Sequence, residues 1–381
     1  MINAPNRMPL LLSVAAACFL ATVTARGQAP AQRAPLAEEV FKNVQVLRGI
    51  PVNEFMGTMG IFSAALGMSC EDCHRSGDTS WENYAAESPR KQMARAMVTM
   101  MAAINKTHFA GRQVITCFSC HRGADRPKPT PNLATLYGAP PPEDPRDVFT
   151  QSPAAPAADA VFDKYLAAVG GAARAAALTS FVASGTSTGY GPDSEPRPFE
   201  LAAKAPNQRA AVARSATGDS STVFDGRSGW IAAPHRPVAV LALGGADLDG
   251  LRLDAELDFP SRIKQIAGQW RSGAATVIDD REVQPVQGTG SGGALVTLYF
   301  DAESGLLVRQ VRSVPSPVGR LPTQVDYADY REVAGVKLPF RWTVTWLDGK
   351  DTVELKDVRP NAAIDAARFA RPPAPVAAPA R

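Results

Sequence analysis

Residues 70–74 read Cys-Glu-Asp-Cys-His and residues 117–121 read Cys-Phe-Ser-Cys-His, so one pentapeptide, Cys-x-x-Cys-His, occurs twice between residues 53 and 123. Cysteines three positions apart lie on the same side of one helical turn, where both thiols can form thioethers to one porphyrin. The histidine that follows then supplies an imidazole nitrogen to the iron. The pattern predicts two covalently bound c-type haems, attached through Cys70, Cys73, Cys117 and Cys120, with His74 and His121 as iron ligands.

Other uses of paired cysteines have to be weighed against haem. One Cys-x-x-Cys would fit half of a structural zinc site or a redox-active dithiol. The four cysteines together make a four-thiolate zinc site the sharpest alternative. Zinc would leave the histidine after each pair without a role, so we favour two haem c groups as the cofactors.

The first 25 residues have the composition of an export signal. Arg7 is the only charged side chain among the first eight residues, and residues 10–24 form an apolar run. Val23-Thr24-Ala25 fits a signal-peptidase site, and the Pro-rich sequence after it favours cleavage over a retained membrane anchor. We therefore expect a periplasmic protein with a signal peptide over residues 1–25. Its removal would also remove Cys18, the one cysteine outside the two pentapeptides.

Composition limits the remaining function classes. The chain has 381 residues, enough for two domains, and its 40 basic against 37 acidic residues give a net charge of +3. A chain with so small a net charge lacks the excess of basic residues that is typical of nucleic-acid-binding proteins. No second long apolar run follows the first, so we expect membrane association only through a partner. The redox partner protein itself is not identified by the sequence.

Three helices are expected around the two pentapeptides. Apolar residues repeat at helical spacing over residues 36–48, with Gly49 and Pro51 ending the pattern. Asn53 is a plausible N-cap for a helix over 54–66 that Gly67 ends. Ser88 and Pro89 open a helix over 89–105, followed by a loop to the second pentapeptide. The order of a methionine-bearing helix, a connection and Cys-x-x-Cys-His therefore occurs twice.

Each haem iron needs a sixth ligand, and methionines lie in the preceding helices. A thioether has no proton to lose and raises the reduction potential of the iron. Met59 precedes Cys70 by eleven residues, with Met56 as its competitor. The candidates for the second haem are Met97, Met100, Met101 and His108. Methionines on one helix face are usually core residues, so the composition of these helices alone leaves the ligands open.

Residues 36–126 resemble the cytochrome subunit bound to photosynthetic reaction centres, a tetrahaem protein. Residues 59–74 fit its pattern M-x-x-x-S-x-x-L-G-x-x-C-x-x-C-H, and residues 116–123 fit T-C-x-x-C-H-R-G. Between them, Trp81, Ser88-Pro89-Arg90 and residues 95–100 fit W…S-P-R and R-x-M-x-x-M. In that family the methionine that opens each of two patterns is the axial ligand, so the resemblance implies Met59 and Met97. With two haem signals instead of four, it implies a stand-alone dihaem relative that transfers electrons.

The rest of the chain reads as a linker and a β-rich domain. Nine prolines make residues 127–157 a semi-rigid linker. From residue 158 a helix over 158–169 precedes runs typical of strands, with possible helical inserts over 243–257 and 259–269. Consecutive strands with few helices predict an antiparallel sheet. The expected strands are 179–188, 198–204, 209–215, 222–224, 276–278, 294–300, 306–311, 323–327, 336–346 and 351–358.

The sequence thus predicts a multidomain fold, with a mainly α dihaem cytochrome c domain (36–126) before a β-rich α+β domain (158–371) and a disordered tail (372–381). The β-rich part resembles periplasmic lipoprotein carriers and sigma-regulator sensors, in which a half-barrel folds over a helix. We expect an electron carrier and not an enzyme. Two alternatives stay open: a peroxidase-like haem enzyme, for which His108 is the candidate distal base, and a sensor or binding protein that acts through the β-rich domain.

Overall fold

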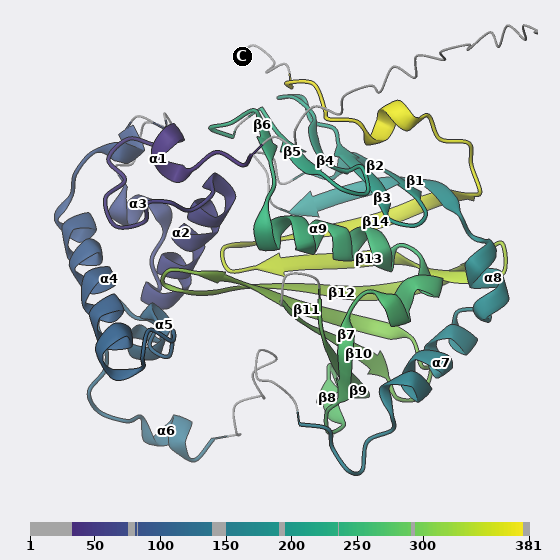
Figure 1. The fold of residues 1–381 in the computed structure, drawn as a ribbon, viewed down its shortest axis with the longest axis horizontal. Coiled ribbons are helices and arrows are strands. Elements are labelled where there is room, and N and C mark those ends of the chain that lie inside the picture. Colours follow the sequence, from purple (N-terminus) through teal and green to yellow (C-terminus); the bar gives the residue numbers. More distant parts are fainter. Residues whose placement is uncertain are drawn as a thin grey trace, which may run out of the picture. The chain divides into compact units, whose positions relative to one another are not determined.

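A computed structural model describes residues 33–74, 81, 83–138, 150–189, 195–234, 236–290 and 294–375 (Figure 1). The expected signal peptide, Cys18, part of the predicted linker and most of the predicted tail lie outside these residues. The described residues all belong to one compact unit. Among them, no helix is both long and apolar enough to cross a bilayer.

The first predicted helix is wrong over most of its length. Instead of spanning 36–48, α1 comprises only Ala37–Val40. The chain turns back at this point, because the Ala37 N–H donates to the Ile50 carbonyl and Leu36 forms a bridge with Pro51. These long-range bonds pair the backbone at Leu36 and Ala37 with Ile50 and Pro51, so the chain between them forms a loop.

The other two predicted helices of this part are confirmed, with shifted ends. The helix α2 comprises Val52–Leu66 and begins after Pro51, so Asn53 lies inside it and is not its N-cap. Gly67 ends α2 in the left-handed conformation, as predicted. Ser88 caps α4 (Pro89–His108) by accepting the Lys91 N–H. The helix α4 runs three residues past its predicted end, which makes His108 its last residue.

Among the described residues, the β-rich part forms one antiparallel sheet of 14 strands, which confirms the predicted sheet class. The ten predicted strands all exist, and β11 and β12 are much longer than predicted. The order across the sheet is β6-β5-β4-β3-β2-β1-β14-β13-β12-β11-β10-β9-β7, and β8 also pairs with β9. The strands are β1 (Ser180–Gly189), β2 (Arg197–Lys204), β3 (Gln208–Ala213), β4 (Ser220–Phe224), β5 (Gly229–Ala232), β6 (Val240–Ala242), β7 (Gly268–Ser272), β8 (Thr276–Ile278), β9 (Arg281–Thr289), β10 (Leu295–Asp301), β11 (Leu307–Ser316), β12 (Gly319–Val333), β13 (Val336–Trp346) and β14 (Gly349–Pro360).

Four strands, β5, β6, β7 and β9, were not predicted. The predicted helical insert over 259–269 is confirmed only in part: a 3₁₀ helix covers Pro260–Gln265, and β7 begins at Gly268. Pro285 and Gly288 lie within β9, and both residue types weaken a strand signal. Pairing with β10 on one side and β7 on the other nevertheless makes β9 a strand.

Helices cover the sheet and form its core with it (Figure 1). The predicted helix over 158–169 is confirmed as α7 (Ala158–Ala168), and α8 (Ala172–Ala177) follows it. Phe162 of α7 meets Phe300 of β10 edge to face, at 5.8 Å between ring centroids. The predicted insert over 243–257 is confirmed as α9 (Gly245–Leu257), which Arg312 of β11 joins through an ion pair to Asp254 (2.7 Å).

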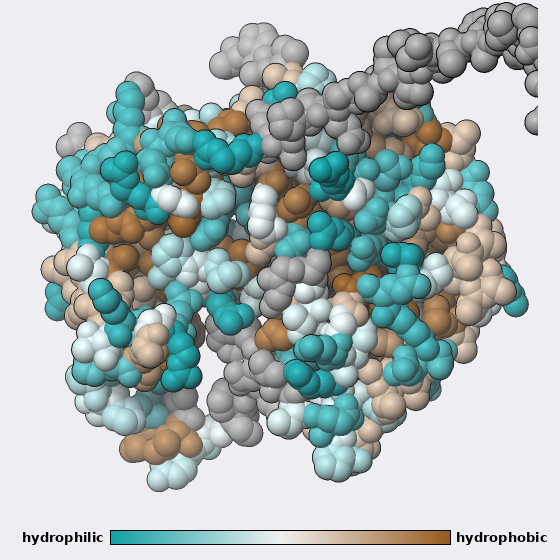
Figure 2. Space-filling model, viewed as in Figure 1, coloured by the Kyte–Doolittle hydropathy of each residue, from teal (hydrophilic) through white to brown (hydrophobic). Residues whose placement is uncertain are grey.

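A short helix, α6 (Leu133–Leu136), lies inside the predicted linker. Leu133 and Leu136 are 67% and 63% exposed, and Tyr137 after them is 82% exposed. Figure 2 shows apolar surface at the position of α6, below the other helices. These exposed fractions show that the described part of the linker contributes little to the core.

Candidate functional site

Each Cys-x-x-Cys-His begins with a short, well-capped helix: α3 is Cys70–Cys73 and α5 is Cys117–His121. The N–H of Ser69 donates to Asp72 Oδ2 (2.8 Å), and the N–H of Thr116 donates to Ser119 Oγ (3.0 Å). In both cases a side chain between the two cysteines bonds back to the N-cap residue, as in a capping box. The spacing and the cap together hold each cysteine pair on one turn.

The two histidines make equivalent hydrogen bonds. Nδ1 of His74 lies 2.9 Å from the Tyr84 carbonyl oxygen, and Nδ1 of His121 lies 3.0 Å from the Ala124 carbonyl oxygen. A carbonyl can only accept, so the proton of each neutral ring lies on Nδ1 and the lone pair lies on Nε2. Metal-ligating histidines are usually oriented by such a bond. Both rings are therefore prepared to bind a metal through Nε2.

Burial supports this protonation state at the first site. Burial and the nearby charge of Lys91 lower the pKa of His74 below its ordinary value, against the opposing effect of the bond to Tyr84. The neutral imidazole, which is the form that ligates iron, is favoured at neutral pH.

The first site is held by the beginning of α4. Ser88 Oγ donates to the Cys73 carbonyl oxygen (3.1 Å), and Arg90 Nη1 donates to the Asp72 carbonyl oxygen (2.7 Å). Lys91 Nζ donates to the Tyr84 carbonyl oxygen at 2.5 Å, so this carbonyl accepts from both the ammonium and the His74 ring. Sequence reasoning did not identify Lys91 or the Tyr84 carbonyl, because neither carries a motif signal.

An aromatic series leads away from the first histidine. The Tyr84 ring lies 4.7 Å from the His74 ring, and Trp81 lies 5.5 Å from Tyr84. Phe41 continues the series at 5.9 Å from Trp81 and stacks on Phe55 of α2 at 5.1 Å. Of these rings, Tyr84 lies directly against the His74 imidazole.

The second site is held by the end of α2 and by the sheet. The N–H of Gly123 donates to the Ala65 carbonyl oxygen of α2 (2.9 Å). Gly123 directly precedes Ala124, whose carbonyl oxygen accepts from His121. The N–H of Cys117 donates to the carbonyl oxygen of Val318, which lies in the turn between β11 and β12 (3.3 Å). Two elements distant in sequence therefore fix the second attachment helix.

The four thiols are free of disulfides and are partly accessible. Cys70 and Cys120 are exposed, whereas Cys73 and Cys117 are half-buried. Burial raises the pKa of the Cys73 and Cys117 thiols. Among the described residues, no three His, Cys, Asp or Glu side chains gather closely enough to hold a metal ion. The four thiols thus do not converge into the zinc site that was the sharpest alternative.

The candidate axial ligands differ in their surroundings. Met59 is half-buried against an apolar cluster of Leu47, Ile61, Val98, Met101 and Val318 that Cys117 also touches. Met56 packs instead against a cluster that contains Phe224 and Leu251 of the β-rich part. Met101 is 5% exposed within the core, Met100 is 47% exposed and His108 is exposed. Met97 is half-buried on α4. Ligation by Met59 and Met97 stays a prediction.

These surroundings fit a haem. Val114 and Phe118, beside and within the second pentapeptide, are 46% and 54% exposed, and Met93 and Met100 of α4 are 60% and 47% exposed. Exposed large apolar side chains can be covered by a bound apolar group. Together with thiols on one turn and oriented histidines, they give a porphyrin the covalent, axial and apolar contacts that it needs.

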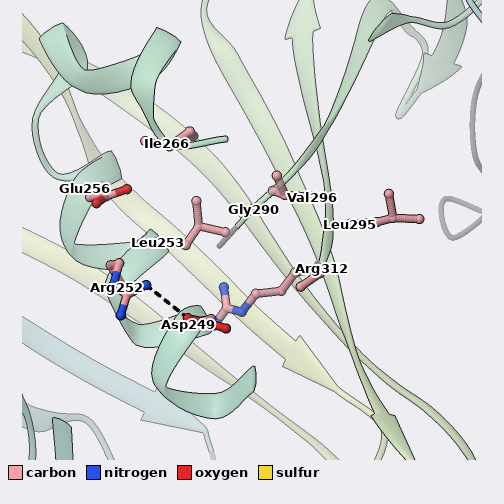
Figure 3. A pocket seen from close by; sticks show the side chains of 11 residues that line it. Asp249, Arg252, Leu253, Glu256, Ile266, Gly290, Leu295, Val296 and Arg312 are labelled. Carbon is pink, nitrogen blue, oxygen red and sulfur yellow. Dashed lines mark hydrogen bonds and ion pairs between the residues drawn. The ribbon is translucent and has the colours of Figure 1, made fainter. Parts of the chain in front are cut away.

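A separate recess lies on the β-rich part, between α9 and the strands β10 and β11 (Figure 3). Leu253, Ile266 and Val296 supply its apolar wall, and Arg252 pairs with Asp249 at 3.1 Å. None of its lining residues belongs to α2, α3, α4 or α5.

Comparison with known proteins supports the resemblance found in the sequence. Residues 14–135 match the family model described as "Photosynthetic reaction centre cytochrome C subunit". The photosynthetic reaction center cytochrome c subunit of Thermochromatium tepidum is 37% identical over 100 residues, which are 25% of this chain and 23% of that protein. The same subunit from Rubrivivax gelatinosus is 34% identical over 99 residues, 25% of each chain. The chain therefore spans about a quarter of the length of the curated relatives that it matches.

Solved structures align with more than half of the chain at low identity. A LolA superfamily protein from Nitrosomonas europaea has 14% identity and a TM-score of 0.39, and covers 57% of this chain and 98% of its own. A DUF1329 family protein from Desulfovibrio piger has 12% identity and a TM-score of 0.40, and covers 56% and 96%. Because both TM-scores are below 0.5, the account of the fold rests on the strand pairing of this chain.

Proposed function

We propose that this chain is a periplasmic electron-transfer protein that carries two c-type haems with His/Met ligation. Cys70 and Cys73 would hold the first haem and Cys117 and Cys120 the second, with His74 and His121 as proximal ligands. Met59 and Met97 would complete the coordination. The observation that carries the proposal is the matched orientation of the two histidines, each with Nδ1 bonded to a carbonyl oxygen.

The haems would supply the one-electron chemistry, and the chain would bind them, orient their ligands and exclude water. The capped helices α3 and α5 hold the thiols, and the carbonyl oxygens of Tyr84 and Ala124 orient the imidazoles. The cluster around Met59 and Val318 gives an apolar surrounding. Apolar burial and a thioether ligand both favour the reduced iron, so a high potential is expected.

An electron carrier agrees better with these residues than a haem enzyme does. A peroxidase needs an open iron and a distal acid–base group. His108, the candidate for that group, is exposed at the last residue of α4. The match to a cytochrome c subunit also favours electron transfer. We propose that the chain exchanges electrons with a redox partner protein, and that this partner is not a reaction centre.

The haem content tests the proposal directly. In protein from a host that matures c-type cytochromes, acid–acetone extraction should leave the haem with the polypeptide. A pyridine haemochrome assay should count two haems per chain, and Cys70→Ala/Cys73→Ala should reduce the count to one. Extractable haem, or zinc in stoichiometric amount, would contradict the proposal.

A further inference from the structure

Most of the turn between β11 and β12 is buried, which is unusual for a hairpin: Ser316, Val318 and Gly319 are buried, and Pro317 is exposed. The two strands pair up to Ser316 and Gly319, so Pro317 and Val318 form the turn. Hairpin turns normally lie at the surface, exposed to water. Val318, however, is 0% exposed. We call Ser316, Pro317, Val318 and Gly319 the hairpin tip.

Val318 of the hairpin tip is buried by the helices of the proposed haem sites. Val318 belongs to the same cluster as Ile61 of α2 and Val98 and Met101 of α4, with Met59 and Cys117 packed against it. Figure 1 shows the long β11–β12 hairpin reaching from the sheet to α2 and α5. Two side chains of the β-rich part, Leu321 and Leu347, also pack against this cluster.

Hydrogen bonds join the hairpin tip to the segment that begins the second attachment helix. The Val318 carbonyl oxygen accepts from the N–H of Cys117 (3.3 Å), the first residue of α5. The Ser316 carbonyl oxygen accepts from Gln113 Nε2 (2.7 Å). The first N–H groups of a helix have no partner within the helix, so the carbonyl of Val318 satisfies one of them.

The helix α2 is shaped for this contact. A Cβ atom on Gly57 would lie 2.8 Å from Leu321 Cδ1, and one on Gly60 would lie 3.3 Å from the side chains of Leu347 and Asp348. Glycine within a helix is destabilising unless close packing requires it. The two glycines therefore let the helix that carries Met59 lie against β12 and the β13–β14 turn.

We propose that the hairpin tip is part of the second haem site, where Val318 positions Cys117 and excludes water from the iron. This inference rests on the proposed function and extends it, because it gives the sheet a part in setting the properties of a haem. Val318 acts through the N–H of Cys117 and through its packing with Val98 and Met101 of α4, the helix that carries the proposed second ligand Met97. It is thus a positioning residue.

The test compares two fully buried valines in the full-length holoprotein. Val318→Ala removes two methyl groups next to Cys117, and Val283→Ala removes the same groups from β9, where Val283 is also 0% exposed but packs against Tyr299 and Val311. Val318→Ala should lower one of the two midpoint potentials, because water then stabilises the ferric charge. It should also accelerate amide exchange of Cys117 about tenfold or more. Val283→Ala should change neither.

Gln113→Ala provides a second variant that keeps the core intact, since Gln113 is exposed. Loss of its bond to Ser316 should lower the same midpoint potential, by a smaller amount than Val318→Ala does. If Val318→Ala does not fold, the potential of Gln113→Ala provides the test. Equal effects of Val318→Ala and Val283→Ala, or silence of both Val318→Ala and Gln113→Ala, would overturn the inference. A wild-type protein without covalent haem would refute the proposed function instead, and Cys117 exchange would still test the contact with the hairpin tip.

Discussion

Lys91 is the residue that most clearly distinguishes the surroundings of the first histidine. Its ammonium donates to the same Tyr84 carbonyl oxygen that accepts from His74, at 2.5 Å. A shared carbonyl is a weaker acceptor for the imidazole N–H, and a nearby cation disfavours the ferric state. Both effects should raise the potential of the first haem.

Lys91→Gln should therefore lower the potential of one haem and leave the other unchanged. The shift should be roughly 30–60 mV, within a tenfold change of a one-electron equilibrium. Lys91→Arg keeps the charge and should restore most of the potential, and Lys106→Gln, which removes a lysine from the last turn of α4, is the control. A potentiometric titration with no difference between Lys91→Gln and Lys106→Gln would contradict this role.

The axial methionines are a second prediction at the residue scale. Met59→Leu keeps most of the volume but removes the sulfur, so it should abolish part of the thioether–iron charge-transfer band and lower one midpoint potential. Met97→Leu should do the same to the other haem.

Met100→Leu is the control, since Met100 is 47% exposed on the same helix as Met97. If Met100→Leu removes the band and Met97→Leu does not, the ligand lies on the next turn of α4. If His108→Ala raises the second potential while Met97→Leu and Met100→Leu are both silent there, that haem has two histidine ligands.

At the scale of elements, the end of α2 and the second attachment loop are in close contact. Gly67 has φ +64°, and a Cβ on it would lie 2.4 Å from the Gly123 carbonyl oxygen. Gly67→Ala should destabilise the protein by roughly 2–5 kcal/mol, as the sum of a left-handed alanine and an overpacked contact. Thermal or denaturant unfolding of the full chain measures this free energy.

Gly49→Ala is the matched control for Gly67→Ala. Gly49 has φ +79°, but nothing lies within 4 Å of its ideal Cβ position. The left-handed conformation alone should then cost roughly 1–2 kcal/mol. Equal destabilisation by the two substitutions would mean that the close approach of α2 to Gly123 does not contribute.

At the scale of the whole molecule, the β-rich part buries charge between its sheet and α9. Asp258 follows α9 and pairs with Arg209 of β3 (3.0 Å), yet burial raises the pKa of Asp258 to about 6 despite that partner. The unfolded chain releases this proton near the ordinary aspartate value of roughly 4. Between these two values the folded state binds more protons, so this group lowers the stability as the pH rises.

Asp258→Asn isolates this contribution, because other groups that titrate in both proteins cancel to a first approximation. Between pH 4 and pH 7 the free energy of unfolding of the wild type should fall by roughly 2 kcal/mol relative to the variant. Urea unfolding at several pH values measures the difference. A difference that stays constant with pH would show that Arg209 compensates fully for the burial of Asp258.

Several features of this chain were predictable because they depend on neighbouring residues. The cysteine spacing and the cap at Thr116 act within one helical turn, and Ser88 with Pro89 opens α4. The strands predicted over 294–300 and 306–311 pair through a turn in which Gly305 takes a positive φ of +76°. Local geometry of this kind can be predicted from the spacing of residues and from the residue types at turns.

Other features could not be predicted, because their partners are far away in the sequence. Gln113 and Ser316 are separated by 203 residues, and no local pattern marks Val318 as a buried residue. The glycines at positions 57 and 60 were the one available signal, since helical glycines often mark close packing. The predicted helix over 36–48 failed for the same reason: backbone bonds to Ile50 and Pro51 outweigh local helix propensity.

The sequence by itself determined the two attachment motifs, the helices α2, α4, α7 and α9, and the antiparallel class of the sheet. Only the tertiary structure decided that the β11–β12 hairpin ends in the apolar cluster around Met59 and Cys117. The sequence could not determine this, because the alternation of side chains along a strand predicts which residues face a core but not which core they face. Val318 is placed there by the close approach of β12 and the β13–β14 turn to Gly57 and Gly60 of α2, and by the bond from the Cys117 N–H at the start of α5. These partners are far apart in the sequence and meet only when the chain has folded.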